Sequence, residues 1–486
     1  MTIKKEPTLW EAFVPILVLI FLLSTNVFLF KADATSGPNQ IAMILAAGVA
    51  GIVSFRLGYT WVEIEGSIVK SISSAMGAIL ILMVIGALSG TWLLSGIVPA
   101  MIYYGLKILN PTIFLFAACV VCCIVSLATG SSWSTVATVG IALLGIGKTL
   151  GIAEPVIAGA IISGAYFGDK MSPLSDTTNL APAMAGTDLF THVRYMVNTT
   201  APTLVITLVI FLVWGFTLDT TATATETDAV LQSIDKAFNL NPLLFVVPAL
   251  VLFMIVRKTP ALPALLIGSI LGGIFAVIFQ PQIVNQISGI DGSYVQSSFM
   301  AVMKAMGSDI AITTDNAMIT ELLSSGGMYG MMNTIWLITC AMTFGGVMES
   351  SGLLKKIAER IILFAHSTGS LVASTAATCI FFNLTASDQY MAIAVPGRMY
   401  ADTYRKRGYK PELLSRTLED SGTVTSVLIP WNTCGATQAR VLGVSTWAYA
   451  PYCFFCIISP LMTVLQAYLN FKIRRFTEDE LRARQD

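Results

Sequence analysis

Long apolar runs separated by short polar stretches dominate the 486 residues of this chain. A helix needs roughly 20 mostly apolar residues to cross a bilayer, and several runs reach that length while others are short or interrupted. The pattern predicts an all-α polytopic membrane protein. We expect the first run to be a retained span, because the apolar part of a signal peptide is shorter, about 7–15 residues. The runs lie at about 10–30, 40–55, 73–95, 112–129, 133–149, 152–167, 199–216, 242–256, 261–279, 328–349, 367–382, 389–396, 422–430 and 445–469.

The charges between the runs indicate the side of the membrane on which each loop lies. Loops rich in Lys and Arg stay in the cytoplasm, so we expect the basic stretches and both chain ends to be inside and the acidic stretches to be outside. The basic stretches are residues 4–5, 257–258, 398–416 and 472–484, and the acidic stretches are 217–240 and 280–327.

Two interrupted runs, at about 112–149 and 367–396, each break at a polar cluster. The loop assignments agree with one another only if each of these runs enters and leaves the membrane on one side. Non-helical backbone at membrane depth is tolerated where it is buried in protein or lines a wet cavity. We therefore predict two re-entrant hairpins, the first dipping in from outside and the second from inside.

A constant offset of 256 residues superimposes similar strings. The strings at 95–97 and 129–132 fall on those at 351–353 and 385–388, and the second match pairs the two hairpin tips. Several matches at one offset, each at an equivalent place in the topology of the two halves, indicate that the second half is a duplicate of the first.

Each half then holds about five spans and one hairpin, and an odd number of spans inverts the second half. Inverted repeats with interrupted segments at matching places are typical of secondary transporters, whose site lies near the midplane. The alternative is a helix bundle with ordinary Gly and Ser packing contacts. The predicted parts are a first repeat at 1–220 (hairpin about 112–149, broken helix about 152–182), an external linker at 221–240 and a second repeat at 241–486 (hairpin about 367–396, broken helix about 418–438).

Composition narrows the functional class. Hydrophobic residues make up 55% of the chain and charged residues 12%, and 28 basic residues balance 28 acidic ones. High hydrophobicity with zero net charge excludes a disordered chain and argues against a nucleic-acid partner. The sequence has no G-x-S-x-G elbow, no P-loop and no H-E-x-x-H motif, so we expect neither an enzyme nor a bound cofactor.

Carboxylates in the apolar part of the chain mark candidate sites, because each costs about 2.5–3.5 kcal/mol at a helix centre. Asp169 and Asp176 flank a break at Pro173, and with Ser172 they would share one face if the helix continued. Carboxylate, hydroxyl and carbonyl oxygens suit a hard cation such as Na⁺, and Asp169 is the first candidate to bind it. A capped helix end in water is the alternative.

Asp388, Glu419 and Asp420 are further candidates for ion or proton binding. Asp388 is the one carboxylate between His366 and Arg398 and lies at the second hairpin tip, although a surface turn would also explain it. Glu419 and Asp420 enter the second broken helix close to the basic stretch, so a surface ion pair is an equally favoured interpretation.

Neutral oxygens beside these carboxylates complete the predicted site. They come from both hairpin tips and both broken helices, where hydroxyl and amide groups can cap helix ends or coordinate an ion. The residues are Ser131, Ser132, Ser134, Thr135, Ser172, Ser175, Thr177, Thr178, Asn179, Asn383, Thr385, Ser387, Asn432 and Thr433.

Three parts of the chain resemble the NhaC family of Na⁺/H⁺ antiporters. They are GSSWST at 130–135, GDKMSPLSDTTN at 168–179, and DSGT at 420–423 with PWNT at 430–433. The similarity extends over nearly the whole chain, and the second string is the most specific. The family is grouped with the ion transporter superfamily, so the resemblance implies paired hairpins, broken helices and elevator-type movement of a transport domain against a scaffold. We expect a homodimer in a bacterial cytoplasmic membrane.

The function expected from these features is exchange of Na⁺ for H⁺, with both ions competing for buried carboxylates at the midplane. Transporters resembling malate/lactate antiporters belong to the same family, so Na⁺/H⁺-coupled exchange of small carboxylates is the alternative. In that case the hairpin tips hold the anion and Lys170 is the countercharge. A third interpretation is a channel or a non-transporting membrane scaffold. The expected partners are Na⁺, H⁺, the lipid bilayer and, under the alternative, a small carboxylate.

Overall fold

The computed structural model describes residues 4–30, 33–34, 36–108, 110–218, 224–290, 292–313 and 323–477. Within these ranges seven helices are long and apolar enough to cross a membrane, or up to nine if two bent helix pairs each count as one span. The prediction of a polytopic helical membrane protein with broken helices is thereby confirmed.

All regular elements in the described part of the first half of the chain are helices. They are α1 (Leu9–Phe30), α2 (Pro38–Arg56), α3 (Trp61–Leu94), α4 (Ile97–Ile108), α5 (Pro111–Thr129), α6 (Ser132–Thr135), a π-helical turn (Val136–Gly140), α7 (Ile141–Thr149), α8 (Glu154–Met171), α9 (Asp176–Ala185) and α10 (Leu189–Thr217). The expected linker at 221–240 contains a further helix, α11 (Ala224–Ala237).

The second half adds a short antiparallel pair of strands to its helices, in which Ile310 pairs with Ser325. Its elements are a 3₁₀ turn (Pro242–Phe245), α12 (Val246–Val256), α13 (Ala261–Phe279), α14 (Pro281–Ser288), α15 (Tyr294–Gly307), β1 (Ile310–Ala311), β2 (Ser324–Ser325), a 3₁₀ turn (Tyr329–Met331), α17 (Met332–Ser350), α18 (Leu353–Ile362), α19 (Thr368–Thr385), α20 (Gln389–Lys406), α21 (Pro411–Leu418), a π-helical segment (Glu419–Thr423), α22 (Val424–Ser426), α23 (Thr433–Leu442), α24 (Thr446–Tyr449), a 3₁₀ turn (Ala450–Tyr452) and α25 (Phe454–Tyr468).

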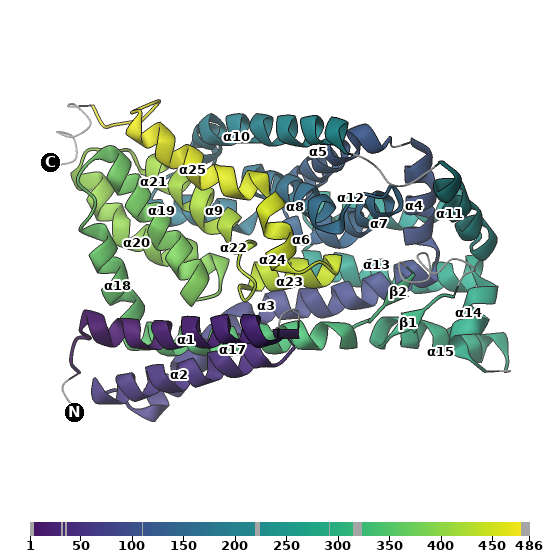
Figure 1. The fold of residues 1–486 in the computed structure, drawn as a ribbon, viewed down its shortest axis with the longest axis horizontal. Coiled ribbons are helices and arrows are strands. Elements are labelled where there is room, and N and C mark those ends of the chain that lie inside the picture. Colours follow the sequence, from purple (N-terminus) through teal and green to yellow (C-terminus); the bar gives the residue numbers. More distant parts are fainter. Residues whose placement is uncertain are drawn as a thin grey trace.

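The helices form two groups. In one, here called the α3 layer, α3 packs against α13 and α17, α17 against α2, and α2 against α1. In the other, here called the α8 group, α8 packs against α5 and α25, α10 against α5 and α25, α20 and α21 against α9, and α19 against α20 and α25. Figure 1 shows α1, α2 and α17 along one edge of the molecule and α10, α5 and α25 along the opposite edge.

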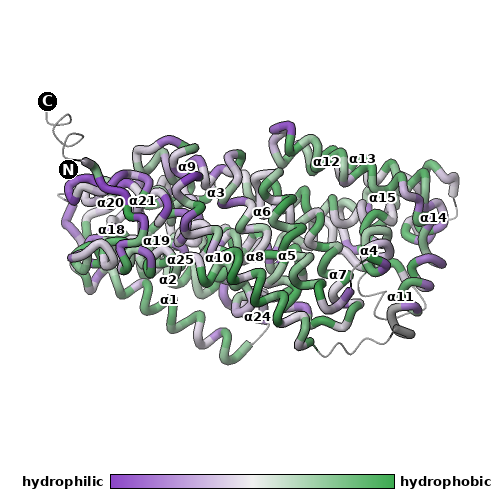
Figure 2. Tube along the Cα trace, turned by 90° about the horizontal axis from the view of Figure 1, so that it is seen from above, coloured by the Kyte–Doolittle hydropathy of each residue, from purple (hydrophilic) through white to green (hydrophobic). Residues whose placement is uncertain are grey.

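Hydrophilic segments concentrate toward the ends of the long axis, around α20 and α21 at one end and around α14 at the other, while the middle is mainly hydrophobic (Figure 2). The described part of the chain begins and ends near the same end of the molecule (Figures 1 and 2). Among the acidic residues of the stretches expected outside, Asp219, Asp291, Asp315 and Glu321 lie outside the described residues.

The first hairpin turns at Gly130, where α5 ends. This glycine has a φ of 70°, a left-handed conformation that residues with a Cβ adopt at a cost. A Cβ there would also lie 2.6 Å from the Cβ of Leu174 and 2.9 Å from the backbone N of Ser175. The tip of the hairpin is therefore pressed against the segment that follows α8.

The helix carrying Asp169 does not continue through Pro173. It ends at Met171, Ser172 has extended backbone, and Ser175 directly precedes a new helix that begins at Asp176. A proline removes a backbone donor and disfavours helix in the residue before it. The helix does not continue, so Asp169, Ser172 and Asp176 do not share one helical face, and a non-helical segment separates the two carboxylates.

Candidate functional site

A cavity of about 740 Å³ lies where the α8 group meets the α3 layer. Its first wall consists of both hairpin tips and the break between α8 and α9, and it contributes Asp169, Asp176 and Asp388. The opposite wall consists of residues 74–81 of α3 and the turn between α12 and α13. Three carboxylates that are far apart in the sequence thus line one cavity.

Asp169 is held from the first hairpin tip. Its side chain is 7% exposed, and its Oδ2 accepts hydrogen bonds from the backbone N of Ser132 at 3.1 Å and from the Ser132 hydroxyl at 2.6 Å. The hydroxyl of Thr178 donates to the backbone carbonyls of Asp169 and Lys170 at 3.1 and 3.0 Å. The first hairpin tip therefore positions one carboxylate oxygen of Asp169. The hydrogen bonds of Thr178 connect the end of α8 to α9 across the helix break.

Three helices of at least eight residues begin on the first wall of the cavity: α9, α20 and α23. The side chains of Asn432 and Asp388 cap α23 and α20, Asp388 by accepting from the backbone N of Met391 at 3.0 Å, and Ser175 directly precedes α9. A helix N-terminus carries about half a positive charge and stabilises nearby anions. This explains how Asp388, only 3% exposed, is accommodated as a carboxylate inside the protein, and the surface-turn interpretation of it is wrong.

The second hairpin tip is held by paired amides. The Asn432 amide donates to the backbone carbonyl and to the Oδ1 of Asn383, each at 3.1 Å. Asn383 in turn donates to the carbonyl of Gly422 at 2.7 Å. Ser387 has a φ of 59° and accepts from the backbone N of Thr433 at 2.9 Å. These residues fix the tip against the second broken helix.

All but one of the other predicted hydroxyl and amide residues fall into two sets, and Ser134 is the exception. Ser131, Ser175, Thr177 and Thr433 line the cavity. Hydrogen bonds to local backbone occupy the side chains of a second set, and the buried Ser134 hydroxyl has no hydrogen-bond partner among the described residues. The second set is Thr135, Ser172, Thr178, Asn179 and Thr385.

Glu419 and Asp420 do not line this cavity. Both are fully buried on the π-helical segment, so the surface ion pair considered for them is wrong. Asp420 forms an ion pair with Lys170, and the hydroxyl of Ser459 on α25 lies 2.9 Å from Lys170 Nζ and 3.3 Å from Asp420 Oδ1. Lys170 is consequently not available as the countercharge of an anion in the cavity.

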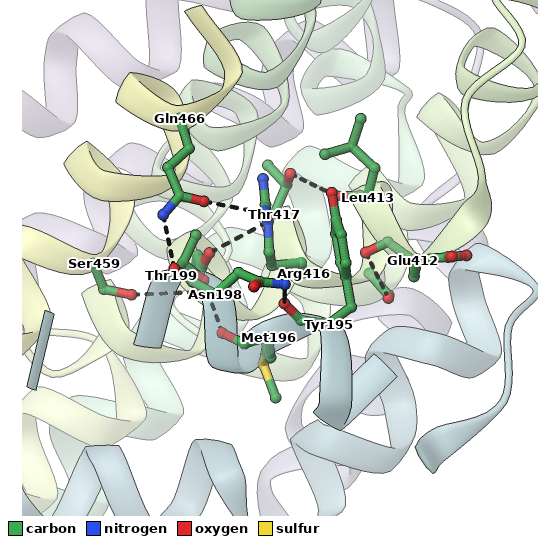
Figure 3. A network of polar contacts seen from close by, with 12 residues as sticks. Tyr195, Met196, Asn198, Thr199, Glu412, Leu413, Arg416, Thr417, Ser459 and Gln466 are labelled. Atoms are coloured by element: carbon green, nitrogen blue, oxygen red, sulfur yellow. Dashed lines mark hydrogen bonds and ion pairs between the residues drawn. The ribbon is translucent and has the colours of Figure 1, made fainter. Parts of the chain in front are cut away.

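Arg416 is also fully buried and does not belong to the cytoplasmic basic stretch. Its guanidinium lies 4.6 Å from the ring centre of Tyr195, its Nε is 4.0 Å from Asp420 Oδ2, and it donates to Gln466 at 3.4 Å. Figure 3 shows this arginine surrounded by side chains from α10, α21 and α25. The Lys170–Asp420 pair and Arg416 therefore form one buried charged cluster in the α8 group.

Lys258, Gln389 and Tyr390 line the cavity although the sequence analysis gave them no role there. Gln389 and Tyr390 directly follow Asp388, and their position beside that candidate residue is the sequence feature that could have indicated them. Lys258 was assigned to a cytoplasmic turn, and no local pattern indicates that this turn reaches the cavity. Among the described residues no three His, Cys, Asp or Glu side chains converge as metal ligands, so a cation at Asp169 would need hydroxyl or carbonyl oxygens as well.

Residues 164–471 match the model of the Na⁺/H⁺ antiporter family. The chain is 34% identical to a Na⁺/H⁺ antiporter NhaC of Alkalihalophilus pseudofirmus, with 97% of each chain covered. It is 36% identical to a malate-2H⁺/Na⁺-lactate antiporter of Bacillus subtilis, with 96% of this chain and 95% of the relative covered. It is 33% identical to an arginine/ornithine antiporter of Halobacterium salinarum, with 97% and 94% covered.

Proposed function

The chain belongs to the NhaC family of Na⁺/H⁺ antiporters, and we propose that it exchanges Na⁺ for H⁺ through the carboxylates of the cavity. The observation that carries the proposal is the meeting of Asp169, Asp176 and Asp388 in one cavity built from both hairpin tips. Carboxylates facing a wet cavity inside a membrane protein are expensive to keep and mark ion and proton pathways.

Asp169 is the proposed shared site for Na⁺ and H⁺. Ser132 donates two hydrogen bonds to its Oδ2, which fixes the carboxylate while its remaining acceptor capacity is free for a cation or a proton. Neutral oxygens of cavity residues such as Ser131 and Ser175 supply further ligands for Na⁺. A proton on the carboxylate removes the charge that attracts Na⁺, so the two ions exclude each other and their movements become coupled.

The other predicted carboxylates receive secondary roles. Asp176 and Asp388 are proposed as additional ion or proton sites, because they line the same cavity. Asp420 and Glu419 lie behind it, and we propose that Asp420 mainly balances Lys170 while Glu419 is a second proton site. The Glu419 carboxylate is fully buried without a hydrogen-bond partner among the described residues, a situation that favours a proton on the group.

We propose an elevator movement of the α8 group along the α3 layer, within two inverted repeats. A second cavity of about 640 Å³ supports this. It lies farther along α3, at Ile85 and Ser89, and is also lined by residues of α7 and by the C-terminal end of α23. The first cavity includes Lys258 of an expected cytoplasmic turn, and the second includes strand residues of the stretch expected outside. Cytoplasmic chain ends and a homodimer remain predictions.

The test is a comparison of Asp169→Asn with Asp188→Asn in proteoliposomes containing a pH-sensitive dye. Asp188 is a matched carboxylate outside the cavity, where it caps α10, and Asn is an equally good capping residue. We expect Na⁺-driven proton movement to persist in Asp188→Asn and to be lost in Asp169→Asn. Full proton movement in Asp169→Asn would remove the basis for the proposed site.

Exchange of small carboxylates is the second candidate function. The relative named a malate-2H⁺/Na⁺-lactate antiporter is as similar to this chain as the relatives named for Na⁺ and H⁺ alone. The positive ends of the three helices that begin on the first wall also suit an anion. Adding malate or lactate to the same proteoliposomes distinguishes the two functions, because organic-acid exchange requires uptake of the acid.

A further inference from the structure

Lys258 brings a positive charge to a cavity otherwise lined by three carboxylates. It is the only Lys or Arg among the described residues that line the cavity. It belongs to the turn between α12 and α13, on the wall opposite Asp169 and Asp388. Its side chain is exposed, and within the described chain it has no ion pair or side-chain hydrogen bond.

The neighbouring Arg257 provides an internal comparison. Both residues lie at the end of α12, where an ordinary interfacial cation extends toward lipid headgroups and water. Arg257 follows that pattern, because its guanidinium lies 5.6 Å from the ring centre of Phe253 and it does not line the cavity. Lys258 has a left-handed φ of 66°, which is uncommon for a residue with a Cβ. The turn thus places one of two adjacent cations at the cavity.

The buried lysine expected to balance an anion is already engaged. Lys170 forms an ion pair with Asp420 and does not line the cavity. If the cavity holds an organic anion, its cationic partner therefore has to come from the opposite wall.

We propose that Lys258 binds the carboxylate of a small organic acid that shares the cavity with Na⁺. This inference rests on the proposed function, because it needs Na⁺ at Asp169. On the first wall the N-termini of α9, α20 and α23 and the side chain of Tyr390 surround the same space, and they favour a negative charge. A monocarboxylate and Na⁺ together add no net charge to the cavity.

The charges also require cooperation between the two solutes. Three ionised carboxylates repel a fourth, so the acid binds after a cation or protons have neutralised part of the charge. Binding coupling is reciprocal, and the acid therefore raises the affinity for Na⁺ by the factor by which Na⁺ raises the affinity for the acid.

The experiment measures uptake of radiolabelled L-lactate and L-malate into proteoliposomes under a Na⁺ gradient. The variants are Lys258→Gln, the conservative Lys258→Arg and the matched control Arg257→Gln, each checked for a monodisperse elution profile. Inhibition of the uptake by unlabelled lactate is compared with inhibition by the uncharged amide of lactate. The ratio of these two inhibitions changes only when the substituted residue recognises the negative charge.

For the wild type we expect Na⁺-dependent, saturable uptake of at least one acid. Lys258→Gln should raise the half-saturating concentration of that acid about tenfold or more, the effect of losing a hydrogen bond to a charged group. It should reduce the preference for lactate over its amide by a similar factor. Lys258→Arg should recover most of the loss, and Arg257→Gln should behave as the wild type.

The inference is overturned if the wild type takes up neither acid, if Lys258→Gln leaves the half-saturating concentration unchanged, or if Arg257→Gln shifts it equally. Failure of the proposed function has a separate signature. Na⁺-driven proton movement measured without any acid depends on Asp169 and not on an organic anion. If that movement is present and the acids have no effect, only the role of Lys258 is refuted.

Discussion

Replacing Asp420 by Asn should destabilise the protein more than replacing Lys170 by Met, although each change breaks the same ion pair. Asp420 serves two cations, because it pairs with Lys170 through Oδ1 and its Oδ2 lies 4.0 Å from Arg416 Nε. All three side chains are fully buried. Removing Lys170 leaves one carboxylate beside one cation, whereas removing Asp420 leaves two buried cations without their shared carboxylate.

The magnitude follows from this difference. Removing one partner of a buried ion pair costs about 3–5 kcal/mol, because the remaining charge is left uncompensated. We expect Lys170→Met to fall near about 3 kcal/mol and Asp420→Asn near or above about 5 kcal/mol. The double variant should lose about 0.5–3 kcal/mol less than the sum of the single losses, as for other residues in direct contact.

The assay is denaturant unfolding of the purified protein in mild detergent, followed by tryptophan fluorescence. Lys355→Met is the control, because Lys355 and Glu359 form an exposed ion pair 3.9 Å apart on α18, and such pairs contribute less than about 1 kcal/mol. Equal losses in the two buried variants, or a double variant with fully additive losses, would refute the shared role of Asp420.

The helix breaks were predictable from local chemistry. Gly130 ends α5 in a left-handed conformation, and Pro173 follows the end of α8. Asn432, a good capping residue, directly precedes α23. Each of these signals acts within a few residues, so the hairpin tips and broken helices could be placed along the chain without knowledge of the tertiary structure.

Long-range electrostatics were not predictable in the same way. Lys170 and Asp420 are separated by 250 positions, and neither local sequence indicates the other as its partner. Arg416 follows several cytoplasmic basic residues and was read with them, but α21 carries it into the protein beside Tyr195. The place of Lys258 at the cavity was not predictable either, because a short basic turn does not reveal which surface it faces.

The remaining predictions concern packing of the hairpins. Gly168→Ala should cost about 1–3 kcal/mol, because its Cβ would lie 2.4 Å from a backbone nitrogen of α5; Gly48→Ala, with no atom within 4 Å of the added Cβ, should be neutral or stabilising. Equal stability of both variants in the same unfolding assay would contradict the close helix contact. Asn432→Ala removes a helix cap and two hydrogen bonds to Asn383, together about 2–3 kcal/mol. Asn241→Ala removes only the cap of a 3₁₀ turn, so it should cost about 1 kcal/mol. The difference between these two losses of stability measures the contribution of the hydrogen bonds between Asn432 and Asn383. Equal losses would show that these hydrogen bonds do not hold the second hairpin tip in place.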